Sequence, residues 1–129
     1  MLMAASAAVA QSYPNRPLRM VIGAATGGTP DILGRIIGQK LNEQLGQPVI
    51  VDNRPGATGN IGADLVAKAA SDGHTMIMAT SVLSISPAFY KNLPFDPLVN
   101  LAPVSQVVSQ AMFLMVPAEL GAKSVADLI

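Results

Sequence analysis

The chain has 129 residues, enough for one domain of ordinary size. Half of its residues are apolar, eight Lys and Arg balance eight Asp and Glu, and aromatic residues make up only 4%. A surface for nucleic acid or for an anionic membrane is therefore not expected, because it would need clustered basic charge and, for bases, stacking aromatics. Cysteine is absent, which excludes disulfides, thiol catalysis and thiolate metal sites.

The first ten residues, MLMAASAAVA, differ in composition from the rest of the chain. They are small and apolar and end in Ala8-Val9-Ala10, the A-x-A pattern that precedes a signal-peptidase cut. The segment lacks a positive n-region and is too short to span a bilayer. We interpret residues 1–10 as the remnant of an export signal, which predicts a mature extracytoplasmic protein that starts near Gln11. The alternative is a plain alanine-rich terminus.

The next stretch predicts a strand, a glycine loop and a helix. The strand covers about Leu18–Gly23, and Gly27 and Gly28 allow a tight turn after it. Thr29 is predicted to cap a helix that has Pro30 in its first turn and ends before Gly46. The apolar stripe of this helix is Ile32, Leu33, Ile36, Ile37, Leu41 and Leu45. Free N–H groups at such a helix start form a generic anion site, but G-x-G-x-x-G and G-K-[ST] are both absent.

Two more strands continue the same pattern. A strand at about 48–51 leads into a second glycine loop, a helix at about 61–70 and a strand at about 75–80. Strand–helix–strand–helix–strand predicts an α/β fold with a parallel βαβαβ core and right-handed crossovers. Ligands bind at the carboxyl ends of such strands, so the loops at 24–29, 53–60 and 80–84 should converge on one edge.

After Pro87 the pattern changes. We predict a single helical turn at 88–91, a proline-broken connection, and two strands at 104–108 and 112–116. Ser124 and Asp127 fit a capping box, so a helix is predicted to start close to the last residue, as in a fragment. An unpaired apolar strand at 112–116 would promote self-association.

The inventory of reactive side chains is nearly empty. His74 is the only histidine and is expected to be structural, and the sequence has neither H-E-x-x-H nor G-x-S-x-G. We therefore predict no catalytic residue, no metal site and no cofactor. A site made of backbone N–H groups, small hydroxyls and water suits binding better than catalysis.

Several segments together resemble a known family: YPNRPLRMVI, GG-x-x-D, QKLNEQLGQPVIVDNRPGATGNIGADLVAKAASDGHT, ISPAFYKNLPFDP, LAPVS and KSVADLI. They are similar to the Bug-type extracytoplasmic solute receptors, the substrate-binding proteins of tripartite tricarboxylate transporters. The resemblance covers about residues 13–129. It implies a two-lobed, type II periplasmic-binding-protein-like clamp that closes on a small carboxylated solute and delivers it to membrane permease subunits.

Family members are two to three times as long, so the resemblance implies an amino-terminal fragment that stops before most of the second lobe. Residues 11–108 would form the first lobe. Residues 109–129 would form the crossover strand and the start of the second lobe.

The resemblance also implies the site residues. The family's loops after the first and third strands meet the ligand carboxylate, partly through ordered waters, and map here onto Ala25, Thr26, Gly27, Gly28, Thr80 and Ser81. Supporting roles fall to Asp31, Asn53, Gly56, Gly59 and Asn60. Asp31 would fix the first loop or receive an amino group of the ligand. The family's usual P-F-x-P-G-G is replaced by Gly23-Ala24-Ala25-Thr26-Gly27-Gly28, a looser loop with an added hydroxyl.

Two alternatives stay open from the sequence. One is a truncated gene product with no function. The other is a small α/β enzyme that uses the same glycine loops for a phosphate or nucleotide, although the chain offers no base, nucleophile or metal site for such chemistry.

Overall fold

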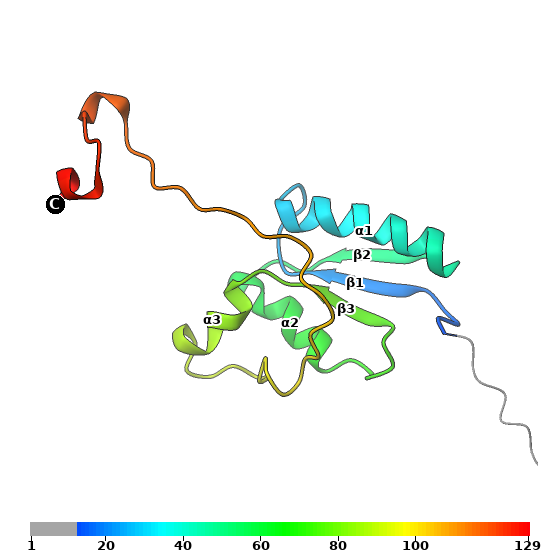
Figure 1. The fold of residues 1–129 in the computed structure, drawn as a ribbon. Helices are drawn as coiled ribbons and strands as arrows, with labels where there is room; N and C mark the ends of the chain where they lie inside the picture. The colour runs from blue at the N-terminus through cyan, green and yellow to red at the C-terminus, as the bar shows by residue number, and fades with distance from the viewer. Residues whose placement is uncertain (1–12) are drawn as a thin grey trace, which may run out of the picture.

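The computed structural model describes residues 13–129, so the predicted signal remnant at 1–10 lies outside the described part (Figure 1). Its α/β body consists of β1 (Leu18–Ile22), α1 (Thr29–Leu45), β2 (Val49–Asn53), η1 (Ala57–Gly59), α2 (Asn60–Ala67), β3 (Thr75–Met78) and α3 (Val82–Phe89). The three strands are parallel and lie in the order β2-β1-β3. The predicted parallel βαβαβ core is confirmed, with strand and helix limits that differ by at most three residues.

The central strand β1 forms the core. Leu18, Met20, Val21 and Ile22 are all at most 2% exposed, as the continuous apolar run predicted. Helices α1 and α2 cover opposite faces of the sheet (Figure 1). Successive β1 side chains alternate between these faces, so Ile22 contacts the α1 side while Val21 lies against α2 at Gly62.

Helix α1 packs on the sheet through small residues rather than through its predicted apolar stripe. Its buried positions are Asp31, Gly34 and Gly38. A Cβ added to Gly34 would lie 2.5 Å from Ile22 Cδ1, and one on Gly38 would lie 3.3 Å from Val49 Cγ1. The glycines let the helix backbone approach the strands closely, which turns part of the stripe outward. The prediction was therefore wrong for Ile32, Ile36 and Leu45, which are exposed.

The ends of α1 follow glycine geometry. Gly46 has φ 69° and its N–H donates to the Asn42 carbonyl at 3.0 Å, so the predicted helix end is confirmed. The N-cap is Gly28 rather than Thr29, and no side chain caps the helix. Thr29 already belongs to the first turn, because the chain becomes helical one residue earlier than predicted.

Helix α3 was not predicted, because residues 80–84 were expected to form a loop. The single turn predicted at 88–91 was wrong: the helix starts at Val82 and ends at Phe89, with Pro87 inside it. Ser86 is fully buried, and its hydroxyl donates to the Val82 carbonyl four residues earlier at 2.9 Å. This bond within the helix satisfies the buried hydroxyl.

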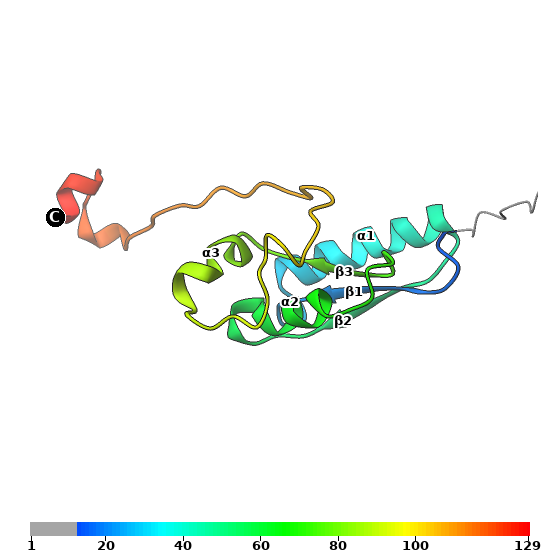
Figure 2. The same cartoon turned by 90° about the horizontal axis from the view of Figure 1, so that it is seen from below.

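Beyond Asn100 the chain leaves the α/β body as an extended segment, in both views (Figures 1 and 2). The strands predicted at 104–108 and 112–116 were wrong, since this segment has no ladder partner among the described residues and only two short turns follow, η2 (Ala118–Leu120) and η3 (Val125–Leu128). The capping box is confirmed, with Asp127 Oδ2 accepting from the Ser124 N–H at 2.9 Å. The division at residue 108 remains a prediction.

The exposed apolar side chains at 112–115 are expected to cause self-association. Met112, Phe113 and Met115 are 97%, 80% and 84% exposed, an unusual density for a monomer surface. Replacing all three by Ser should lower the weight-average mass measured by sedimentation while leaving the melting temperature unchanged, because none of them packs on the body. A monomeric parent chain at high micromolar concentration would contradict this expectation.

Candidate functional site

The three loops at the carboxyl edge of the sheet converge, as predicted. Arg54 N–H donates to the Ile22 carbonyl at 2.8 Å, which joins the end of β1 to the chain after β2. A Cβ added to Gly23 would lie only 2.9 Å from Gly59 Cα, so the backbones of the first and second loops are in contact. Helices α1, α2 and α3 all begin at this edge.

A cavity of about 270 Å³ opens where the loops meet. Its eleven lining residues come from all three loops, and none of them is charged. Two carry hydroxyls, Thr58 and Thr80, and two are glycines, Gly23 and Gly59. The remainder are apolar: Ala24, Pro30, Ile77, Met78, Ala79, Val82 and Leu83.

The cavity contains few of the predicted site residues. Of the predicted ligand residues Thr80 lines it, and of the supporting residues Gly59 does. Ala25, Thr26, Gly27, Gly28 and Ser81 are exposed at the same edge of the sheet but outside the lining. Sequence reasoning did not single out Thr58, Val82 or Leu83 as site residues, although all three lie in loops predicted to converge here.

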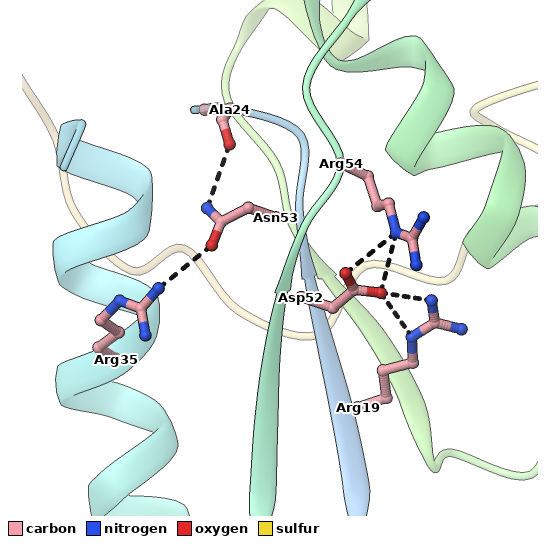
Figure 3. A network of polar contacts seen from close by, with 6 residues as sticks. All are labelled: Arg19, Ala24, Arg35, Asp52, Asn53 and Arg54. Carbon is pink, nitrogen blue, oxygen red and sulfur yellow. Dashed lines mark hydrogen bonds and ion pairs between the residues drawn. The ribbon is translucent and has the colours of Figure 1, made fainter. Parts of the chain in front are cut away.

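The first loop is fixed from within by Asp31. This carboxylate is 3% exposed, and its Oδ2 accepts from the Gly27 N–H at 2.9 Å. Asn53, at the end of β2, donates through Nδ2 to Asp31 Oδ1 at 3.0 Å and to the Ala24 carbonyl at 3.1 Å. Figure 3 shows Asn53 between Ala24 and Arg35, whose Nη2 donates to Asn53 Oδ1 at 3.2 Å.

These contacts decide what Asp31 can do. The Gly27 N–H, and then the Arg35 hydrogen bond, lower the pKa of Asp31 to about 2, so it is charged at neutral pH. Arg35 Nη2 lies 3.0 Å from Asp31 Oδ1 and completes the set of donors. Asp31 therefore joins the first loop to α1 and β2, and its role toward a ligand stays a prediction. The Gly27 N–H already donates to Asp31 and is therefore not available to a ligand.

Asp52 forms a second polar cluster, on the α2 side of the sheet (Figure 3). Its Oδ2 accepts from Arg19 Nε on β1 and its Oδ1 from Arg54 Nε, each at 3.0 Å. The Arg19 hydrogen bond is the main reason that the pKa of Asp52 lies below its usual value. Arg19, Arg35 and Arg54 are each paired with an aspartate. None of the eleven residues that line the cavity is cationic.

The second glycine loop has an unusual backbone. Gly56, Ala57, Thr58 and Gly59 have φ of 125°, 45°, 55° and 95°, so two non-glycine residues adopt the left-handed region. Thr58 Oγ1 donates to the Ala57 carbonyl at 2.6 Å and lies 3.0 Å from the Tyr90 hydroxyl. The loop is thereby tied to the end of α3, and one hydroxyl-bearing residue is held at the cavity.

Asn60 follows this loop at the start of α2. It is 6% exposed, and neither its Nδ2 nor its Oδ1 has a hydrogen-bond partner in the described residues. Gly56 is confined by Ile61, whose Cδ1 would lie 2.5 Å from an added Cβ. Both residues lie beside the cavity-lining residues of the second loop without lining the cavity themselves.

His74 lies at the opposite end of β3 from the cavity. It is 6% exposed, its Nδ1 is 3.1 Å from the Asp72 carbonyl, and its ring meets Tyr13 edge-on at 5.0 Å. Within residues 13–129 no three His, Asp or Glu side chains come together as a metal site would require. No helix in the same range combines the length and the apolar character needed to cross a membrane.

The chain matches the family model described as tripartite tricarboxylate transporter family receptor over residues 33–129. A UPF0065 protein of Bordetella bronchiseptica is 41% identical over 124 residues, 95% of this chain and 37% of that protein. Protein BugT of Bordetella pertussis is 37% identical over 122 residues, again 37% of its length. The chain thus spans about 37% of the length of these relatives.

Solved structures show the same fold. The periplasmic binding protein BugD superposes with a TM-score of 0.65 at 36% identity over 68% of this chain and 29% of that one. An R. palustris protein with adipate gives 0.64 at 38% identity, covering 67% and 29%. MatC from Rhodopseudomonas palustris with bound malate gives 0.63 at 32% identity, covering 74% and 33%.

The matched family is described as a family of receptors. Its structural neighbours are periplasmic binding proteins, and the three-stranded body of this chain corresponds to about 30% of them. By sequence and by fold, this chain belongs to the tripartite tricarboxylate transporter receptor family.

Proposed function

We propose that this chain is the amino-terminal part of an exported solute receptor that captures a small carboxylate for a tripartite tricarboxylate transporter. The observation that carries the proposal is the cavity of about 270 Å³ at the carboxyl edge of the sheet, where all three loops meet. A cavity of this size suits a small solute, since sites for drug-sized ligands start at roughly 300 Å³. The adipate and malate complexes of two structural neighbours support a carboxylate as that solute.

The carboxylate would be held by backbone donors, by hydroxyls and by ordered waters. The N-termini of α1 and α3 both lie at this edge, and helix N-termini favour anions. The predicted ligand residues Ala25, Thr26, Gly28, Thr80 and Ser81 stay in the proposal. Gly27 is no longer proposed as a donor to the ligand, because its N–H donates to Asp31.

The remaining wall of the cleft would come from a second lobe. The relatives are nearly three times as long, so residues 109–129 would form the crossover and the start of that lobe. Export to the periplasm and delivery to membrane permease subunits belong to the same proposal. With one wall only, the chain of 129 residues should bind weakly.

Weak binding is best followed residue by residue. We expect titration of the ¹⁵N-labelled chain with adipate to shift the backbone amide signals of residues 24–28, 58–60 and 79–83, with a Kd near or above about 1 mM. The same titration with sodium chloride at matched ionic strength is the control for screening.

The result can be localised against a distant reference. The amides of residues 72–75, at the other end of the sheet, should not move. If adipate, malate and citrate all leave the cavity amides unmoved at tens of millimolar, or if they shift the residues around His74 instead, the proposed site is wrong.

A further inference from the structure

The lining of the cavity restricts the kind of carboxylate that fits it. Ile77, Met78, Val82 and Leu83 are the large apolar side chains among its eleven lining residues, none of which is charged. Arg35 and Arg54, which lie closest to the first two loops, are paired with Asp31 and Asp52. A carboxylate held here has an apolar surface beside it, and that surface offers no cationic side chain to a further charge placed directly on it.

We infer that this lobe selects aliphatic straight-chain dicarboxylates over hydroxylated dicarboxylates and tricarboxylates. The inference depends on the proposed function and names the solute class for the same site. One carboxylate would take the backbone donors at the carboxyl edge, while the methylene chain would lie on Val82 and Leu83. Hydroxyl groups on the chain would lose water without gaining a partner, apart from those within reach of Thr58 or Thr80.

A separate set of contacts, those of Asp31, disfavours amino acids as ligands. Asp31, the one buried carboxylate near the edge within residues 13–129, has both oxygens occupied by Gly27, Arg35 and Asn53. A ligand ammonium group would have to displace these donors, so an α-amino dicarboxylate should bind more weakly than the matching unsubstituted one.

The test is a homologous series on the complete 129-residue chain, read from the amide shifts of residues 79–83. Affinity should rise about two- to fourfold per added methylene from succinate through glutarate to adipate, the upper value corresponding to full burial. Tartrate, aspartate and citrate should all bind more weakly than succinate or glutarate.

Two variants of the same helix separate the cavity wall from a general effect on α3. Leu83→Ser should remove the gain per methylene, because Leu83 lines the cavity. Ile85→Ser makes the same kind of change at a 51% exposed position outside the lining and should keep the gain. Circular dichroism melting checks that both variants fold.

The possible failures are distinguishable. If no carboxylate moves these amides, the proposed function itself is wrong. If carboxylates bind there but affinity is flat with chain length, or citrate or tartrate binds most tightly, the receptor proposal stands and the aliphatic selectivity is overturned. The same holds if Leu83→Ser keeps the full gain.

Discussion

Gly23→Ala is expected to destabilise the chain by about 1–3 kcal/mol, the usual cost of forcing a methyl group into a packed site. The added Cβ would lie 2.9 Å from Gly59 Cα and 3.1 Å from the Gly59 carbonyl oxygen. These are backbone atoms, so no side-chain rotation relieves the contact. Gly59 has φ 95° and is followed directly by α2, so the second loop would have to move as a whole.

The matched control is Gly28→Ala. Gly28 has φ −76°, and the nearest atom to an added Cβ outside its chain neighbours is the Ala25 carbonyl oxygen at 3.6 Å. The free energy of unfolding of Gly28→Ala, measured in urea, should stay within about 0.5 kcal/mol of the value for the parent chain. Equal losses for the two variants would show that the contact between the first and second loops does not stabilise the fold.

Gly23→Ala should also weaken carboxylate binding, because Thr58 and Gly59 line the cavity and would shift with the second loop. The amide-shift titration with adipate measures this loss of affinity, in buffer without urea, where the variant is folded. A variant that is destabilised yet binds adipate as the parent does would place the ligand away from the second loop.

The parallel core could be predicted from the sequence because its signals are local. Met20, Val21 and Ile22 form one apolar run, Gly46 supplies a left-handed helix end, and each strand is followed by a loop and a helix. The convergence of the three loops then follows from the handedness of parallel crossovers. None of this needs a contact between residues distant in sequence to be known beforehand.

The residues that line the cavity, and the donors that are free there, could not be predicted in full, because they depend on contacts that a local sequence pattern does not reveal. The Gly27 N–H looked free for a ligand, but its partner is a carboxylate four residues later that Asn53 orients from another strand. The face of α1 was set by Gly34 and Gly38, whose small size outweighs the apolar stripe. Residues 80–84 were predicted as a loop, so the helical start of α3, which places Val82 and Leu83 on the cavity wall, was missed.

Asp31→Ala is expected to release the first loop. It removes the acceptor of the Gly27 N–H and leaves Asn53 Nδ2 with the Ala24 carbonyl alone. Buried donors without partners are costly, so the melting temperature should fall and the amides of residues 24–28 should exchange faster with solvent. Asp31→Asn, which keeps the shape and one acceptor oxygen, should restore part of the protection at Gly27.

The same carboxylate gives the loop a defined acid limit. The pKa of Asp31 is about 2 in the folded chain, against about 3.9 for a free Asp side chain. A lowered folded pKa means that the stabilisation is complete above about pH 4 and is lost as the pH falls toward 2. Asp31→Asn should therefore flatten the pH dependence of the urea midpoint between pH 4 and 2.

Asp72 is the matched control for this titration. Its pKa is also lowered to about 2, first by the His74 N–H and then by Arg16, but it lies at the opposite end of the sheet. Asp72→Asn should flatten the stability profile over the same pH range and yet leave the Gly27 amide signal unchanged. Only Asp31→Asn should abolish the movement of that signal on acidification. If the Gly27 signal still titrates near pH 2 in Asp31→Asn, another group holds the loop and Asp31 is not its anchor.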